Sequence, residues 1–235
     1  MAVPPAAALI AAAGSGERLG AGGPKALVLA AGRPLIAWSI EAFAAAASVG
    51  AAVVAAPPGF EADIESATRA AAGERLAIAV VTGGDSRAES VARALAAVDA
   101  ELLAVHDAAR PLVTPELIEA MIARLRGEPG ADGVIAAQAV TDTIKRAAGD
   151  GAVGATEPRE GLWRAQTPQL FRAELLRAAH ARAGDAATAT ATATDDSMLV
   201  ELAGGRVLIE PAPPENLKVT TPADLRFAES LLRER

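Results

Sequence analysis

The 235-residue chain contains no cysteine and only two histidines. The absence of cysteine excludes disulfides, thiolate metal sites and a cysteine nucleophile, and two histidines leave little for an imidazole-based zinc site. We therefore expect any metal to be bound by oxygen atoms. The chain has two tryptophans, four phenylalanines and no tyrosine, with a net charge of −7. Few stacking side chains and a negative charge disfavour nucleic-acid binding, so we expect no nucleic-acid partner.

The sequence also lacks a long apolar run. No segment approaches the roughly 18 consecutive apolar residues that would span a bilayer, so we expect no membrane partner. The opening stretch MAVPPAAALIAAAG has no basic region and leads directly into a glycine-rich loop rather than to a cleavage site. We expect a cytoplasmic protein.

Short apolar runs alternate with longer Ala/Leu-rich stretches that carry charges at helical spacing. This alternation is typical of βαβ units and predicts an α/β fold with a mostly parallel sheet in one domain, 1–235. We expect strands near 7–12, 51–56, 76–81, 101–106, 133–138 and 206–210. We expect helices near 34–47, 60–72, 86–98, 115–126, 172–183, 195–203 and 222–233.

Two segments depart from this alternation. Residues 139–170 are polar, contain glycine and proline, and show no helical pattern, so we interpret them as an excursion from the main sheet, an arm. The low-complexity stretch 187–196, ATATATATDD, is expected to form a mobile loop.

The first predicted strand runs into the glycine-rich loop GSGERLGAGGPK, which ends at Lys25. Its backbone N–H groups are expected at the carboxyl edge of the sheet, where a phosphate can bind. The spacing G-x-G-x-x-x-G differs from the dinucleotide pattern, no acidic residue ends the second strand, and the Gly-Lys-Ser/Thr of a P-loop is absent. Arg18 and Lys25 bracket the loop and suit a triphosphate. The alternative is a flexible turn with solvated charges.

The loop resembles the nucleotide-binding signature of sugar-nucleotide-type nucleotidyltransferases. Further segments narrow this resemblance, because they occur in the order and approximate spacing of the 2-C-methyl-D-erythritol 4-phosphate cytidylyltransferase family. They are GGDSRAESV (83–91), HDAARP (106–111), DTIKR (142–146), PREGLW (158–163), QTPQLF (166–171), TDDSML (194–199) and ENLKVTTPADL (215–225). The resemblance covers nearly the whole chain and implies a Rossmann-like nucleotidyltransferase domain with a protruding dimerisation arm.

The resemblance implies that a phosphate oxygen of methylerythritol phosphate attacks the α-phosphorus of CTP and that pyrophosphate leaves, a step of the non-mevalonate isoprenoid pathway. A phosphate monoester is already an anion at neutral pH, so no general base is required. The catalytic task is positioning and charge neutralisation, which suits Arg, Lys and a divalent cation such as Mg²⁺.

The resemblance carries roles onto individual residues around the nucleotide. Asp107 follows the apolar run ELLAVH and is expected to present a carboxylate to the phosphates as the Mg²⁺ ligand. The alternative role for Asp107 is that of a helix cap. His106 is expected to be structural. Arg18 and Lys25 are implied to contact the triphosphate and the transition state. Backbone N–H groups that donate to the triphosphate are implied for Ala12, Ala13, Gly14 and Gly16. The cytosine contacts fall on Gly83, Gly84 and Ser90, unless the two glycines merely form a turn with Ser86 as the cap of a helix.

Other implied roles concern the acceptor and a second subunit. The residues implied to contact the acceptor substrate are Arg110, Thr167, Thr194 and Lys218. Lys218 is also implied to face the α-phosphate of CTP. Thr143 and Arg159 lie in the arm, which in the family crosses to a neighbouring subunit and completes its site, so a homodimer is implied. Arg18, Lys25, Arg159 and Lys218 are the expected catalytic residues. Glu215 stands where aspartate is common and is left out of the metal site.

Two other functions stay open. A ribitol-phosphate or other polyol-phosphate cytidylyltransferase would share the nucleotide half, although HDAARP and DTIKR favour methylerythritol phosphate. A non-catalytic nucleotide-binding module on the same fold is the alternative of another class. Cations are expected at both ends of the α-phosphorus, which disfavours a module that only binds the nucleotide.

Overall fold

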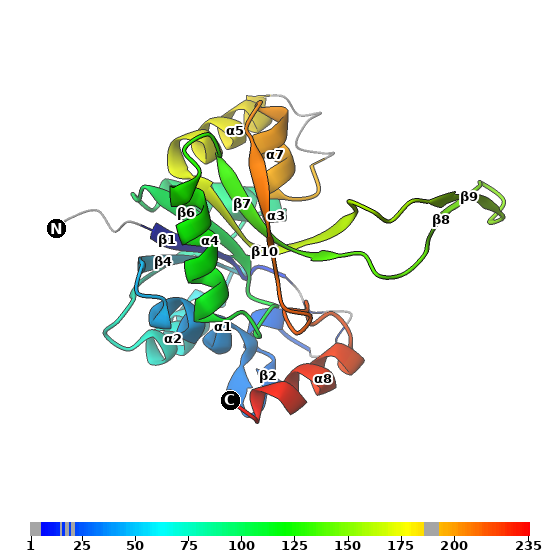
Figure 1. Cartoon of the computed structure of the whole chain (residues 1–235). Helices are drawn as coiled ribbons and strands as arrows, with labels where there is room; N and C mark the ends of the chain where they lie inside the picture. Colours follow the sequence, from blue (N-terminus) through cyan, green and yellow to red (C-terminus); the bar gives the residue numbers. More distant parts are fainter. Residues whose placement is uncertain (1–5, 15, 17–18, 20–21, 186–192) are drawn as a thin grey trace.

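A seven-stranded sheet forms the centre of the protein in a computed structural model, which describes residues 6–14, 16, 19, 22–185 and 193–235 (Figure 1). Its strand order is β11-β7-β10-β6-β1-β4-β5. Every strand runs parallel to its neighbours except β10, which is antiparallel to both β6 and β7. The strands are β1 (Ala6–Ala11), β4 (Val49–Ala56), β5 (Ala77–Thr82), β6 (Leu102–Asp107), β7 (Gly133–Ala139), β10 (Trp163–Arg172) and β11 (Val207–Pro211). The expected α/β class with a mostly parallel sheet is confirmed.

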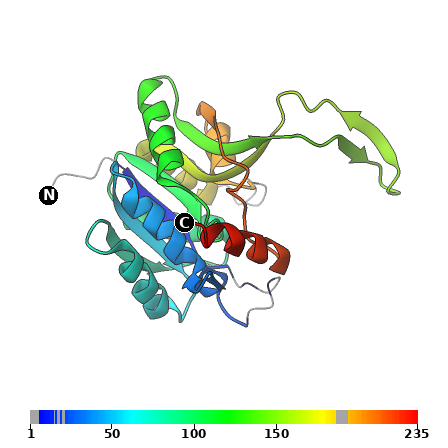
Figure 2. The ribbon, with the colours of Figure 1, turned by 60° about the horizontal axis from the view of Figure 1, so that its bottom comes forward.

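Helices cover both faces of the sheet (Figures 1 and 2). Because side chains alternate along a strand, Ala8 and Ile10 of β1 face one helical layer while Ala7 and Leu9 face the other. The first layer contains α1 (Leu35–Ala45), α2 (Glu61–Ala72) and α4 (Pro115–Gly127). The second contains α3 (Arg87–Ala96), α5 (Ala173–Asp185) and α7 (Asp196–Leu202). A fully apolar strand such as β1 is therefore buried on both faces.

A smaller cluster packs beside the main layers. The last helix, α8 (Pro222–Leu232), contacts a short hairpin of β2 (Leu29–Ala30) and β3 (Arg33–Pro34), which follows the 3₁₀ helix η2 (Lys25–Leu27). Leu35, Val219 and Leu232 are buried in this cluster. Packing of α8 at this position sets the path of the preceding segment, which carries Lys218.

Local sequence signals fix the starts of several helices. Thr114 caps α4 and Thr221 caps α8, each by accepting a hydrogen bond from the N–H three residues later and each followed by a proline at the first helical position. Ser86 caps α3 in the same way. The seven predicted helices and six predicted strands are all present, with ends shifted by at most a few residues.

A projecting hairpin lies within residues 139–170, the segment expected to leave the main sheet. Two antiparallel strands, β8 (Ile144–Ala147) and β9 (Val153–Glu157), project away from the body in both views (Figures 1 and 2). The N–H of Val140 donates to the C=O of Leu162 at 3.0 Å and marks the base. Residues 163–170, however, belong to β10 in the central sheet. We call residues 140–162 the arm from here on.

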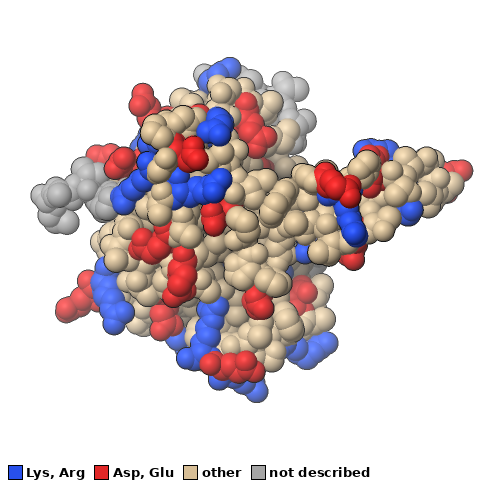
Figure 3. All heavy atoms as spheres, in the orientation of Figure 1, with Lys and Arg blue, Asp and Glu red and all other residues tan. Residues whose placement is uncertain are grey.

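Among the residues that the structure describes, no helix is both long and apolar enough to cross a membrane. Lys, Arg, Asp and Glu are interspersed on the face seen in Figure 3, arm included. Most of the predicted 187–196 loop, residues 187–192, lies outside the described part of the chain.

Candidate active site

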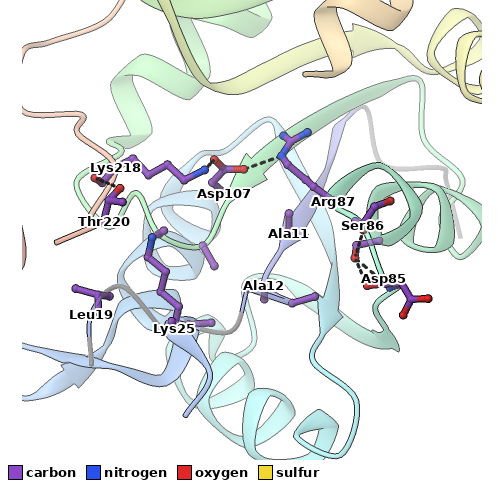
Figure 4. A pocket seen from close by; sticks show the side chains of 18 residues that line it. Ala11, Ala12, Leu19, Lys25, Asp85, Ser86, Arg87, Asp107, Lys218 and Thr220 are labelled. Atoms are coloured by element: carbon purple, nitrogen blue, oxygen red, sulfur yellow. Dashed lines mark hydrogen bonds and ion pairs between the residues drawn. The ribbon is translucent and has the colours of Figure 1, made fainter. Parts of the chain in front are cut away.

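A cavity of about 510 Å³ opens at the carboxyl edge of the parallel strands. Its walls come from the segments that follow β1, β5 and β6, together with the segment before α8. Figure 4 shows Lys25 and Lys218 on one side, Asp85, Ser86 and Arg87 on the other, and Asp107 between Lys218 and Arg87. Ligand sites of open α/β sheets lie at this edge, so the fold itself points to this cavity.

The loop after β1 forms one wall through Ala12, Ala13, Gly14 and Gly16, and Lys25 closes it. The N–H of Lys25 donates to the C=O of Gly14 at 3.1 Å, which folds the loop back on itself. Gly16 has a φ of +75°, and an added Cβ would meet the oxygen of Gly23 at 2.9 Å. A glycine is therefore required there.

Ala12 and Arg18 of this loop were expected to contact the triphosphate. Ala12 lines the cavity, but its N–H donates to the C=O of Ala55 at 3.0 Å and is engaged in the sheet rather than offered to a ligand. Arg18 lies outside the described residues.

Asp107 ends β6 and accepts from two cations. The Nε of Arg87 lies 3.0 Å from Oδ1, and the Nζ of Lys218 lies 2.7 Å from Oδ2. Burial alone would raise the pKa of Asp107, but the charges of Arg87 and Lys218 lower it below its usual range. Asp107 is thus a carboxylate held at the cavity wall, and it caps none of the described helices.

Arg87 lines the cavity but was not among the residues expected there. Its guanidinium lines the cavity and bridges Asp107 to Asp196, whose Oδ2 lies 2.6 Å from Nη1. Asp196 is buried and also lies 2.9 Å from the Nε2 of His180. The bridge joins residues 20 and 109 positions apart, so no local spacing signals it.

The segment 83–86 forms the wall opposite Lys25. Gly84 and Ser90 line the cavity, whereas Gly83 does not. An added Cβ on Gly83 would meet the Cβ of Ala13 at 2.7 Å, so this glycine allows the two walls to approach. The hydroxyl of Ser90 accepts from the N–H of Gly84 at 3.0 Å and donates to the C=O of Ser86 at 2.9 Å.

A buried polar network lies behind Asp107, outside the cavity lining. The hydroxyl of Thr167 accepts from the N–H of Asp107 at 3.0 Å and contacts the Nδ1 of His106 at 3.1 Å. Arg110 donates to the C=O of Asn216 at 2.8 Å, and its Nε is buried without a partner among the described residues. Burial lowers the pKa of His106 to about 3, although Asp107 opposes the shift. His106 is therefore neutral and structural.

Like Gly83, Arg110 and Thr167, three further described residues of the predicted site do not line the cavity. Thr143 and Arg159 are exposed in the arm, where Arg159 donates to the C=O of Thr141. Thr194 is exposed just before Asp195, the N-cap of α7. The cavity lining of the single chain therefore includes Lys25, Lys218, Asp107 and the two glycine-containing walls, but not these three.

The fit of a metal rests on Asp107. No cluster of three or more Asp, Glu, His or Cys side chains occurs in the described part of the chain. Mg²⁺ is commonly bound by one or two carboxylates, with substrate phosphates and water as the other ligands. Each oxygen of Asp107 accepts one hydrogen bond and can offer a second lone pair. The residues fit a magnesium ion that arrives with a nucleotide.

Comparisons with known proteins agree with this geometry. The model of the family "IspD: 2-C-methyl-D-erythritol 4-phosphate cytidylyltransferase" matches residues 6–234. The 2-C-methyl-D-erythritol 4-phosphate cytidylyltransferase of Frankia casuarinae is 43% identical over 99% of this chain and 83% of its own length. That of Deinococcus radiodurans is 44% identical over 97% of this chain and 90% of its own length.

Solved structures are similar throughout the fold. The 4-diphosphocytidyl-2C-methyl-D-erythritol synthase of Anaerococcus prevotii superposes with a TM-score of 0.82 and 28% identity, covering 97% of this chain and 96% of that one. The 2-C-methyl-D-erythritol 4-phosphate cytidylyltransferase of Thermus thermophilus gives 0.76 and 33%, covering 96% and 98%. With its fold, its cavity and a family match over nearly its full length, this chain belongs to the 2-C-methyl-D-erythritol 4-phosphate cytidylyltransferase family.

Proposed function

We propose that this protein transfers CMP from CTP to 2-C-methyl-D-erythritol 4-phosphate and releases pyrophosphate, in the non-mevalonate route to isoprenoids. The observation that carries the proposal is the cavity in which Lys25, Lys218 and the Arg87–Asp107 pair surround one volume at the carboxyl edge of the sheet. The family match supplies the identity of the substrates.

The chemistry needs no protein base. An oxygen of the acceptor phosphate forms a bond to the α-phosphorus of CTP, and the bond from that phosphorus to the bridging oxygen of the β-phosphate breaks. Because a phosphate monoester has a second pKa near 6, the attacking oxygen is an anion at neutral pH. A neutral, buried His106 outside the cavity agrees with this requirement.

The protein's task is to hold anions close together. Lys25 and Arg18 neutralise the triphosphate and the crowded transition state, while Lys218 binds the α-phosphate and orients the acceptor. Asp107 keeps Lys218 and Arg87 in place through hydrogen bonds at 2.7 and 3.0 Å. Cations on both sides of the cavity, Lys25 and Lys218 on one side and Arg87 on the other, favour group transfer over binding alone.

Asp107 would also hold Mg²⁺. When bound, this ion neutralises the charge of the leaving pyrophosphate. The carboxylate position at the end of β6, inside the cavity, supports this role.

We further propose that the enzyme is a cytoplasmic homodimer in which the arm of one chain completes the site of the other. The exposure of Thr143 and Arg159 in a projecting hairpin supports this arrangement, because neither residue lines the cavity of its own chain. The other residues proposed to contact methylerythritol phosphate are Thr167, Arg110 and Thr194. The cytosine is proposed to bind at Gly83, Gly84 and Ser90.

The test is pyrophosphate release by the purified protein with Mg²⁺, each of the four nucleoside triphosphates, and either methylerythritol phosphate or ribitol phosphate. We expect CTP and methylerythritol phosphate to be the best pair, with CTP preferred by at least about a hundredfold because a site that hydrogen-bonds the base rejects others strongly. Faster turnover with ribitol phosphate would identify a polyol-phosphate enzyme. CTP binding without pyrophosphate release would identify a nucleotide-binding module.

A further inference from the structure

Two side chains outside the cavity hold the wall formed by residues 83–86. This wall, which we call the 83–86 loop, connects β5 to α3, and its residues Gly84, Asp85 and Ser86 line the cavity. Glu89 and Arg93 stand one and two turns into α3 and do not line the cavity. They contact the loop from its outer side.

The contacts are made to the main chain of the loop. Oε2 of Glu89 accepts from the N–H of Asp85 at 2.9 Å, and Nη1 of Arg93 donates to the C=O of Gly83 at 2.7 Å. The same two side chains bind each other, with Nη2 of Arg93 2.5 Å from Oε1 of Glu89. The hydrogen bond from Arg93 lowers the pKa of Glu89, which keeps the pair charged at neutral pH.

Steric contact adds to these hydrogen bonds. A Cβ added to Gly84 would lie 2.3 Å from Cδ and 2.6 Å from Cβ of Glu89. The glycine at 84 is therefore explained by Glu89, which covers this position from the outside. The loop is confined between Glu89 on one side and the cavity on the other.

An exposed ion pair on a helix usually contributes little to stability. Glu89 and Arg93 differ from such a pair because three charge-assisted hydrogen bonds join them to each other and to two peptide groups of a cavity wall. A loop that is already ordered loses less conformational entropy when a ligand binds. The pair can thus affect binding without touching the ligand.

We propose that Glu89 and Arg93 are positioning residues that hold the 83–86 loop in the conformation that receives the cytosine of CTP. The inference rests on the proposed function for the identity of the base. It concerns the base half of the cavity only, since Lys25 and the loop after β1 form the other wall.

The consequence is a selective loss of affinity. Without the pair, the loop must be ordered by the nucleotide itself, so CTP binds more weakly, while inorganic triphosphate, which has no base, binds as before. Turnover at saturating CTP changes little, because the loop is already ordered in the bound complex.

The experiment uses Glu89→Met and Arg93→Met in the full-length protein, with calorimetric Kd values for CTP and for inorganic triphosphate in the presence of Mg²⁺. The chain offers a matched control in Glu65→Met, since Glu65 and Arg69 form an i,i+4 ion pair on α2 at 2.8 Å. The side chains are similarly exposed, 46% and 59% for the control pair against 43% and 45% for Glu89 and Arg93.

We expect the Kd for CTP to rise about tenfold in both variants, and that for triphosphate to change less than about twofold. The control should match the wild type for both ligands. Arg93→Lys should fall between Arg93→Met and the wild type, because an ammonium cannot span Glu89 and the C=O of Gly83 as the planar guanidinium does. Arg93→Lys also serves if Arg93→Met fails to fold, as judged by circular dichroism.

Unchanged CTP affinity in the Met variants would overturn the inference, and so would equal weakening of CTP and triphosphate. A wild-type protein that binds CTP but releases no pyrophosphate would refute the proposed reaction and leave the comparison of Kd values intact.

Discussion

The cavity and the arm are held together in different ways. Around Asp107, hydrogen bonds join distant parts of the sequence: Lys218 and Asp107 are 111 positions apart, and Arg87 and Asp196 are 109 apart. Only the 83–86 wall is held by near neighbours, 4 positions apart for Asp85 and Glu89 and 10 for Gly83 and Arg93. In the described arm, side-chain hydrogen bonds join near neighbours, 11 positions apart for Arg146 and Glu157 and 18 for Arg159 and Thr141. The fold of one chain therefore fixes the cavity, whereas it leaves the arm residues exposed.

This contrast indicates where each region acts. Residues that the folded chain already brings together can bind a ligand within that chain. Thr143 and Arg159 are exposed in the arm and do not line the cavity of their own chain, so under the proposed dimer they would act on the neighbouring chain. Changes in the two regions should therefore differ in their effects and in whether a second chain can repair them.

The largest effect is expected in the cavity. Lys25→Ala should lower kcat roughly a hundredfold, because it removes a cation that neutralises charge developing in the transition state. Arg18→Ala should do the same. The measurement is steady-state pyrophosphate release together with a thermal melt, and Arg69→Ala on α2 is the control. Near-normal turnover in either variant would remove that residue from the catalytic set.

A smaller but more diagnostic effect concerns the arm. Arg159→Ala and Lys25→Ala should each be weak alone but should complement each other when co-expressed, because a mixed dimer contains one site with both residues intact. Random pairing makes about half of the dimers mixed, so activity should approach roughly a quarter of the wild type per site.

The matched control is co-expression of Lys25→Ala with Asp107→Asn. Both changes lie in the cavity of their own chain, so every site of a mixed dimer keeps one defect and no recovery is expected. If the Arg159 and Lys25 pair recovers no more than this control, despite proven subunit exchange, Arg159 does not act across subunits.

Acid should weaken the body of the protein through Asp196. Burial raises the pKa of this carboxyl, but His180 and Arg87 outweigh that effect and lower it. A group with a lowered folded-state pKa stabilises the fold above its unfolded value, about 3.9 for aspartate, and loses this contribution as the pH falls through the folded value. The free energy of unfolding should therefore fall below about pH 4, and less steeply in Asp196→Asn. Equal slopes between pH 4 and pH 2 would contradict this role.

The smallest effect is expected for the ion pair of the arm. Arg146 and Glu157 are 2.6 Å apart, but the side chain of Arg146 is 72% exposed, so solvent screens the interaction. Glu157→Gln should change the free energy of unfolding by less than about 0.5 kcal/mol. Urea unfolding of the variant at neutral pH is the measurement, and a loss above 1 kcal/mol, roughly twice that bound, would show that the arm is held as firmly as the body.

Much of the architecture could be predicted because the periodicity is local. Apolar runs became β1, β4, β5, β6, β7 and β11, and the hydroxyl-proline starts at Thr114 and Thr221 became capped helices. The strand β10 was missed, because Pro168 and the surrounding glutamines make a buried strand look like a loop. Its burial depends on neighbours β6 and β7, which the local sequence does not reveal.

Parts of the candidate cavity follow from local sequence patterns for the same reason. The position of Asp107 follows from the apolar strand β6 that it ends, and the position of the glycine-rich loop follows from the apolar strand β1 that precedes it. Arg87 could not be placed in this way, because its partners Asp107 and Asp196 are 20 and 109 positions away. The resemblance named the residues of the arm, but the single chain does not bring them to the cavity.

The most direct test of the central claim follows the phosphorus atoms of CTP. The protein is incubated with Mg²⁺, methylerythritol phosphate and CTP labelled with ³²P at either the α- or the γ-position. The account predicts that the α-label appears in a product bonded to the acceptor and that the γ-label appears in pyrophosphate at the same rate. Transfer of the γ-label to the acceptor, or release of the α-label as free CMP, would contradict cytidylyl transfer.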